Sequence, residues 1–423
     1  MVQTAVGWLT LHYTSSAELG HYYVFVAWTL TLGWVLGFGL PEQAMRIVSV
    51  AYSGVGQTQA RSLCLTALSL SLASGALTFL VLKLAVSIPS ELRIIFPSMT
   101  GAIWSPSALP EPVITAFGVT GLVGSRVAAQ LLKSCRLVTL GLYTEFVIPF
   151  TPLVIGAWFF GESSRLDSTH LIWLHVLGGF LSIFSAIVVL THHIRRTVPG
   201  KYALLTAVRQ LLLGVGPQWF AVAMQSILLN APLIAVSILA DAAAAGIFGL
   251  CMRLAAISMI GTDVIIAIRG PSFAEFHTKG EIQLLQRSFS ASRRAAVALA
   301  VPITILLIVF SQPILRFFGV KEVAFAQEIL IVLLLGRLIY AFVGPVSYFL
   351  WMIRAFREEI VATVAALTIL VSGTLIVGNL SFKNPTFALS VLTTASLSVR
   401  FVLQFFLAGR KTAAANLDPK KGD

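Results

Sequence analysis

Long apolar segments alternate with short polar ones along almost the whole chain. A helix needs about 20 mainly apolar residues to cross a bilayer. Eleven segments meet this criterion, and the pattern therefore predicts an all-α polytopic membrane protein. The predicted spans are 22–40, 62–86, 113–132, 138–160, 171–190, 215–240, 242–268, 295–310, 328–351, 360–377 and 387–407.

The composition supports lipid as the main solvent. Hydrophobic residues make up 57% of the chain and charged residues only 11%, whereas soluble domains carry about 25% charged residues. The net charge of +12 does not indicate nucleic-acid binding, because the basic residues lie in short loops between apolar spans. We therefore expect no nucleic-acid partner and no soluble catalytic domain.

The distribution of basic residues predicts the topology. Of the 29 Lys and Arg residues, 19 fall in one set of alternate loops, six in the opposite set and four within the spans. Because cytoplasmic loops carry the excess of Lys and Arg, this pattern predicts a cytoplasmic C-terminus. It also predicts that the basic amphipathic segment 272–294 lies along the anionic cytoplasmic leaflet.

The two halves of the chain share a motif order. The first half has Glu18-Leu19-Gly20 at the start of a span, then Gly39-Leu40-Pro41 and a polar segment. The second has Ala244-Ala245-Gly246, then Arg269-Gly270-Pro271 and a longer polar segment. Gly and Pro also punctuate many helix ends, but the repeated order favours two pseudo-repeated bundles of about six helices each.

This repeat predicts an N-terminal lobe at 1–191, a cytoplasmic linker at 192–209 and a C-terminal lobe at 210–423. Residues 1–11 are apolar but too short to span a bilayer. We expect them to be the end of a first helix whose start is truncated.

Apart from Lys83 and Glu328 near span ends, six charged residues fall within the predicted spans, where charge is costly and commonly functional. Four are arginines, so the intramembrane charge is mainly cationic, and arginine suits phosphate because its planar group donates two hydrogen bonds. Arg126 and Arg253 either line a cavity or form structural ion pairs. Arg337 is a further cavity candidate for which a structural role is favoured, and Arg400 is expected to be structural or to extend toward a headgroup.

Different roles are expected for the two acidic residues. Glu145 lies beside Pro149 and Pro152, which should kink its helix. Its carboxyl group either carries a proton or pairs with an arginine. Asp263 lies near the cytoplasmic end of its span and is expected to pair with Arg269 or with a basic residue of the segment 272–294.

Three polar residues follow the span 215–240. Gln218 and Gln225 are seven residues apart and share a helix face, with Asn230 further along. They could bind sugar hydroxyls, or bond neighbouring helices. No metal-ligand spacing and no phosphate-binding Gly-x-x-x-x-Gly-Lys motif occurs, so we expect no metal, cofactor or ATPase activity.

The most specific resemblance is carried by the second half. It has Asn230-Ala231-Pro232, the run from Ala243 to Ala255, the run from Gly270 to Glu281, and Pro302 inside the following span. This order resembles the polysaccharide-exporter (Wzx-type) branch of the MATE/MOP superfamily. The resemblance covers most of the chain, but it is degenerate and specifies the family better than the substrate.

The resemblance implies a non-enzymatic flippase. Such proteins move undecaprenyl-diphosphate-linked oligosaccharides across the bacterial inner membrane for O-antigen or exopolysaccharide synthesis. It also implies contacts with membrane lipids and with polymerase and chain-length components. One departure is that many relatives have a charged Asp-Arg pair shortly after the asparagine, where this chain has Ala231, Pro232 and Leu233.

Three alternatives remain open. A MATE-type drug antiporter should have an acidic cavity, whereas the intramembrane charge here is mostly basic. An enzyme of the same pathway should have a large charged external loop, whereas the segment 87–112 holds only Glu91, Arg93 and Glu111 as charges. A membrane scaffold of a polysaccharide assembly system is the third.

Overall fold

The computed structural model describes residues 14–53, 57–86, 111–161, 167–194, 208–209, 211, 216–353, 355–380 and 382–417. All regular structure in these residues is helical. Ten helices are long and apolar enough to cross a membrane, and a bent helix pair makes up to eleven. The predicted all-α polytopic fold is confirmed. The expected truncated first helix, at 1–11, lies outside the described residues.

Contacts divide the chain into two compact units, 1–238 and 239–423. The predicted lobe boundaries stay a prediction, and most of the predicted linker lies outside the described residues. Unit 1 contains α2 (Ser16–Leu36), α3 (Leu40–Ser53), α4 (Gln57–Val86), α6 (Pro112–Ser134), α7 (Val138–Phe146), η2 (Ile148–Phe150), α8 (Thr151–Gly161), α9 (Ser168–Ile194) and α11 (Gly216–Leu239).

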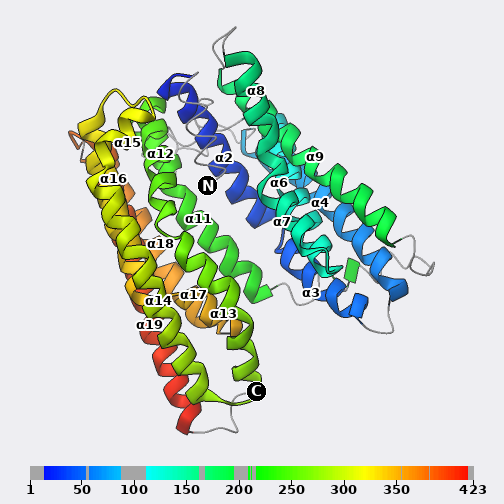
Figure 1. Ribbon diagram of the computed structural model, residues 1–423. Helices are drawn as coiled ribbons and strands as arrows, with labels where there is room; N and C mark the ends of the chain where they lie inside the picture. Colours follow the sequence, from blue (N-terminus) through cyan, green and yellow to red (C-terminus); the bar gives the residue numbers. More distant parts are fainter. Residues whose placement is uncertain are drawn as a thin grey trace. The chain divides into compact units, whose positions relative to one another are not determined.

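Unit 2 contains the remaining helices (Figure 1). They are α12 (Ala242–Ile257), α13 (Ile260–Thr278), α14 (Ile282–Val309), α15 (Ser311–Phe317), α16 (Val323–Val343), α17 (Val346–Met352), α18 (Phe356–Asn379) and α19 (Pro385–Leu417).

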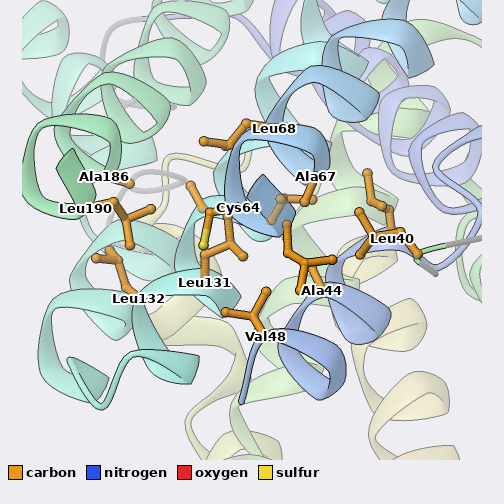
Figure 2. Close-up of a cluster of buried hydrophobic side chains, with 14 of the residues drawn as sticks. Leu40, Ala44, Val48, Cys64, Ala67, Leu68, Leu131, Leu132, Ala186 and Leu190 are labelled. Atoms are coloured by element: carbon orange, nitrogen blue, oxygen red, sulfur yellow. The ribbon is translucent and has the colours of Figure 1, made fainter. Parts of the chain in front are cut away.

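Helix α6 is the centre of unit 1, where it packs against α2, α3, α4, α7 and α9. Figure 2 shows part of its buried cluster, in which α3, α4, α6 and α9 each contribute small or aliphatic side chains. Leu131 of α6 lies beside Cys64 of α4 and near Ala44 and Val48 of α3, whereas Leu132 lies toward Leu190 of α9. The polar segment after Pro41 is therefore a helix whose apolar face closes one end of the unit.

The two halves begin their first described spans in the same way. Ser15 accepts a hydrogen bond from the backbone N–H of Glu18, at 3.2 Å. Asp241 accepts one from the backbone N–H of Ala244, at 2.7 Å. Each side chain satisfies a donor that the first helical turn would leave unpaired. Both caps precede the repeated Gly20 and Gly246 motifs, which supports the correspondence between the halves.

Prolines break the predicted span 138–160, as expected. Helix α7 ends at Phe146, a 3-10 turn holds Pro149, and α8 begins at Thr151. Pro149 cannot donate a backbone hydrogen bond and lies in the break, whereas Pro152 is in the first turn of α8, where a missing N–H is tolerated. Gly178 of α9 lies against the backbone carbonyl of Pro149, where a Cβ atom would clash.

Two other predicted spans differ from the structure. The span 328–351 was predicted to be continuous, but α16 ends at Val343 and α17 starts at Val346. Gly344 has a φ of +87° and Pro345 follows it, so the chain turns there. The span 242–268 consists of α12 and the start of α13, which are bent by 51°.

The close approach of α6 and α9 yields a stability prediction. A Cβ atom added at Gly179 would lie 2.8 Å from the Cα of Gly121. Gly179→Ala should therefore force the two backbones apart and cost about 1–3 kcal/mol, seen as a lower unfolding temperature in detergent. Gly216→Ala is the matched control, because a Cβ atom there meets nothing within 4 Å. Equal unfolding temperatures for the two variants would contradict this packing.

Candidate substrate-binding site

The first candidate site lies where α6 packs against α2. The guanidinium carbon of Arg126 is 4.5 Å from the ring centre of Trp34, within the range of a cation–π interaction. Arg126 is half-buried. The indole therefore holds a positive charge at membrane depth and keeps its planar donor group in a defined orientation.

Two hydrogen bonds join helix α11 to the same helix, α2. The indole N–H of Trp219 donates to the backbone carbonyl of Val35, at 2.9 Å. The Ser226 hydroxyl donates to the carbonyl of Leu30, at 3.3 Å. These two bonds are seven residues apart along α11 and fix which of its faces meets α2. The ring of Phe38 lies 5.4 Å from that of Trp219.

The polar residues predicted on α11 have different environments. Gln218 and Gln225 are half-buried, and the side-chain carbonyl oxygen of Gln225 is buried without a hydrogen bond from the described residues. Asn230 donates to the backbone carbonyl of Ser226, at 2.8 Å, and to its hydroxyl, at 3.3 Å. Asn230 thus bonds within its own helix, whereas Gln225 retains an acceptor.

Glu145 does not meet an arginine. It forms an ion pair with Lys133, in the last turn of α6. A Cβ atom at Gly141 would lie 2.7 Å from the Lys133 Cγ, so the glycine leaves room for the lysine stem. Lys133 is seven residues from Arg126, about 10 Å along the helix axis. The sequence placed Lys133 in a loop, which is why this partner was missed.

In unit 2, Asp263 of α13 is within electrostatic range of Arg337 of α16, but the two form none of the ion pairs of the described residues. The expected pairing of Asp263 with Arg269 is not among the ion pairs of the described residues. Arg253 is half-buried in α12, a helix that packs against α16. A role of Arg253 and Arg337 in lining a cavity stays a prediction.

Arg400 of α19 is a deeply buried charge in unit 2. Its guanidinium lies 2.5 Å from the carboxylate of Glu359, and the two side chains are 1% and 0% exposed. It also donates to the hydroxyl of Thr363, at 3.1 Å. Gln404 donates to the second carboxylate oxygen of Glu359, at 2.6 Å, and accepts a hydrogen bond from Ser347, at 3.0 Å.

This network decides between the two expectations for Arg400, in favour of the structural role, and adds one residue. Arg400 does not extend toward a headgroup, because Glu359 neutralises it inside the unit. Glu359 was missed because it lies at the start of α18, just before the predicted span. The polar positions of α19 could have indicated a buried partner, since they recur on one face: Thr393, Ser396, Arg400 and Gln404.

A resident metal site is not indicated in the part of the chain that the structure describes. No group of three or more His, Cys, Asp or Glu side chains there could hold a metal ion. The structure instead gives α2 a stacked cation from α6 and, through separate contacts, an indole and a hydroxyl from α11. Such a set can bind an anionic group and hydrogen-bonding groups without chemical conversion.

Comparisons with known proteins give structural neighbours only. No family model and no curated protein matches the chain. One neighbour is a multidrug-resistance MATE family transporter of the MOP superfamily in an inward-facing conformation. It has a TM-score of 0.67 and 12% sequence identity, and the match covers 99% of this chain and 95% of the transporter chain. A second neighbour is the lipid II flippase MurJ in an inward closed conformation, with a TM-score of 0.62 and 16% sequence identity. The match covers 96% of this chain and 85% of the MurJ chain.

A third neighbour is a MOP superfamily transporter from Pyrococcus furiosus, described by the reverse polarity of its binding pocket. It has a TM-score of 0.57 at 13% identity and covers 98% of this chain and 92% of its own. At these identities the comparisons establish the fold alone. The chain is a multi-pass membrane protein with the fold that MATE transporters and the MurJ flippase share.

The buried Arg400 network yields a second stability prediction. Glu359→Gln leaves the arginine charge uncompensated, which should cost about 3–5 kcal/mol and lower the unfolding temperature in detergent. Glu358→Gln is the adjacent control, since its pair with Lys411, at 3.4 Å, is partly exposed and should be worth about 1 kcal/mol or less.

The double variant Glu359→Gln/Arg400→Gln should recover part of that loss, because it removes the unpaired charge. If Glu359→Gln unfolds at the wild-type temperature, the ion pair is not a structural requirement.

Proposed function

We propose that this protein flips undecaprenyl-diphosphate-linked oligosaccharide units across the bacterial inner membrane, for O-antigen or exopolysaccharide synthesis. The observation that carries the proposal is the Arg126–Trp34 pair between α6 and α2. It supplies an oriented cation at membrane depth, where a diphosphate must be accommodated. The fold shared with MATE transporters and with a lipid II flippase supports transport or flipping in general.

The chemistry of the site suits both parts of such a headgroup. A guanidinium donates two parallel hydrogen bonds to phosphate oxygens. The indoles of Trp34 and Trp219 offer flat apolar faces with one polar edge each, which suit sugar rings. The buried acceptor of Gln225 suits a sugar hydroxyl, since an unsatisfied buried polar group is otherwise costly.

The proposed mechanism is alternating access. The lobes would expose the headgroup site first to the cytoplasm and then to the opposite side, while the polyprenyl chain stays in lipid. The protein would lie in the inner membrane with a cytoplasmic C-terminus, as the basic loops predict. It would act without catalysing a reaction and would pass its cargo to polymerase and chain-length components.

A MATE-type antiporter of small molecules is the second candidate. It is favoured by the similarity to multidrug-resistance MATE transporters. An organic cation would be repelled by Arg126 and should bind near an acid. Arg126 would therefore favour binding of the anionic headgroup of a flippase substrate and disfavour binding of a cationic antiporter substrate. A scaffold role for polysaccharide assembly would make no demand on it.

Export in cells tests the proposal. In a bacterium lacking its own oligosaccharide flippase, the wild-type protein should restore surface polymer and relieve the accumulation of lipid-linked units. Arg126→Ala should reduce this export about tenfold or more, because a charged hydrogen bond to phosphate is worth about 1.5–3 kcal/mol. Arg316→Ala, in the exposed last turn of α15, removes the same charge and should export normally.

Protein in the membrane must be measured alongside polymer. Full export by Arg126→Ala at wild-type protein levels would exclude the proposed site. Wild-type protein that exports no polymer but confers resistance to organic cations would favour the antiporter instead.

A further inference from the structure

A separate groove lies in unit 2, where α14 begins and α19 ends, with α17 beside them. It has a volume of about 530 Å³. Four of its ten lining residues are phenylalanines, and two are arginines, one on α14 and one on α19. α14 and α19 run side by side in this unit (Figure 1). The groove is distinct from the Arg126 site, which lies in unit 1.

The apolar part of the groove is rigid at its base and open at its edge. Phe349 is 2% exposed, and its ring centre lies 4.6 Å from that of Phe289. Phe406, by contrast, is 63% exposed. An acyl chain can therefore lie along Phe406 while the base keeps its shape.

The two arginines supply the polar part. The Arg293 guanidinium carbon lies 5.5 Å from the ring centre of Phe405. A Cβ atom at Gly344 would lie 2.9 Å from the Arg293 Cγ, so the arginine stem passes close to the turn between α16 and α17. Arg410 contributes the second guanidinium, from the exposed part of α19.

Acidic side chains do not compensate this charge among the described residues that line the groove, none of which is Asp or Glu. Neither Arg293 nor Arg410 lies within ion-pair distance of a carboxylate in the described ranges, whereas the neighbouring Lys411 pairs with Glu358. Two cations beside an aromatic surface match a ligand with a phosphate group and an apolar chain.

We propose that this groove binds one anionic phospholipid of the cytoplasmic leaflet. The phosphate lies between Arg293 and Arg410, and an acyl chain follows Phe406. The groove lies at the level of the headgroups, because Arg293, Arg294, Arg410 and Lys411 are at the end of the unit that the basic loops assign to the cytoplasm. Such a lipid would bridge α14 and α19 and stabilise unit 2 through the same contacts.

Native mass spectrometry of the purified full chain tests the site. Phosphatidylglycerol should bind with one tightly held copy, and phosphatidylcholine should not. Arg293→Gln/Arg410→Gln should weaken the tight copy about 5- to 30-fold, as expected for two cations near a lipid surface. Phe406→Ala should weaken it less.

The matched control is Arg287→Gln/Arg294→Gln. It removes the same charge from residues of α14 that do not line the groove. Equal weakening by both double variants would show general surface attraction and overturn the site. Displacement of the lipid by millimolar inorganic phosphate would show that the groove recognises free phosphate rather than a lipid. Lipid-dependent thermal stabilisation provides a second readout, which should be lost only in the groove variant.

This test is independent of transport. If the tight lipid is absent while the wild-type protein restores export, the groove proposal fails and the proposed function stands. If the tight lipid is present while export is not restored, the reverse holds.

Discussion

The lack of hydrogen-bonding partners in the bilayer core is the constraint on which the structure depends. A backbone in hydrocarbon must satisfy its own polar groups, and helices do so within one segment. All regular structure in the described residues is accordingly helical. Two helix breaks have a local cause in the sequence. Gly344 and Pro345 turn the chain between α16 and α17, and Pro149 lies in a 3-10 turn that packs against Gly178.

The same constraint separates structural charges from functional candidates. Arg400 and Glu359 are almost fully buried and satisfy one another, with Gln404 and Thr363 completing the network. Such a cluster fixes the packing of α18 and α19 and leaves no capacity for a substrate. Arg126 differs, because it is half-buried and stacked on an aromatic ring. A partly exposed cation oriented in this way suits an anionic ligand, which is why the proposed function depends on it.

The sequence predicted the features of the fold that depend on the length of an apolar run or on the chemistry of a single residue. Apolar runs located the spans, and Pro149 and Pro152 predicted the break after α7. The prediction of a continuous span at 328–351 was wrong. Gly344 and Pro345 form a turn inside an apolar run, and the length of the run alone does not reveal that turn. The partners of buried charges were not predicted correctly. Glu145 pairs with Lys133 and not with an arginine, and Glu359, the partner of Arg400, was missed at a span boundary. The Trp34 ring beneath Arg126 could not be predicted, since it depends on how α2 packs against α6.

The most direct measurement is transport by purified protein in lipid vesicles. A fluorescent polyprenyl-diphosphate-linked oligosaccharide is placed in both leaflets, and a membrane-impermeant reagent reports how much reaches the outside. The proposed function predicts rapid equilibration of this lipid with wild-type protein, little with Arg126→Ala, and no uptake of an organic cation. Equal rates for wild-type and protein-free vesicles, or cation uptake alone, would contradict it.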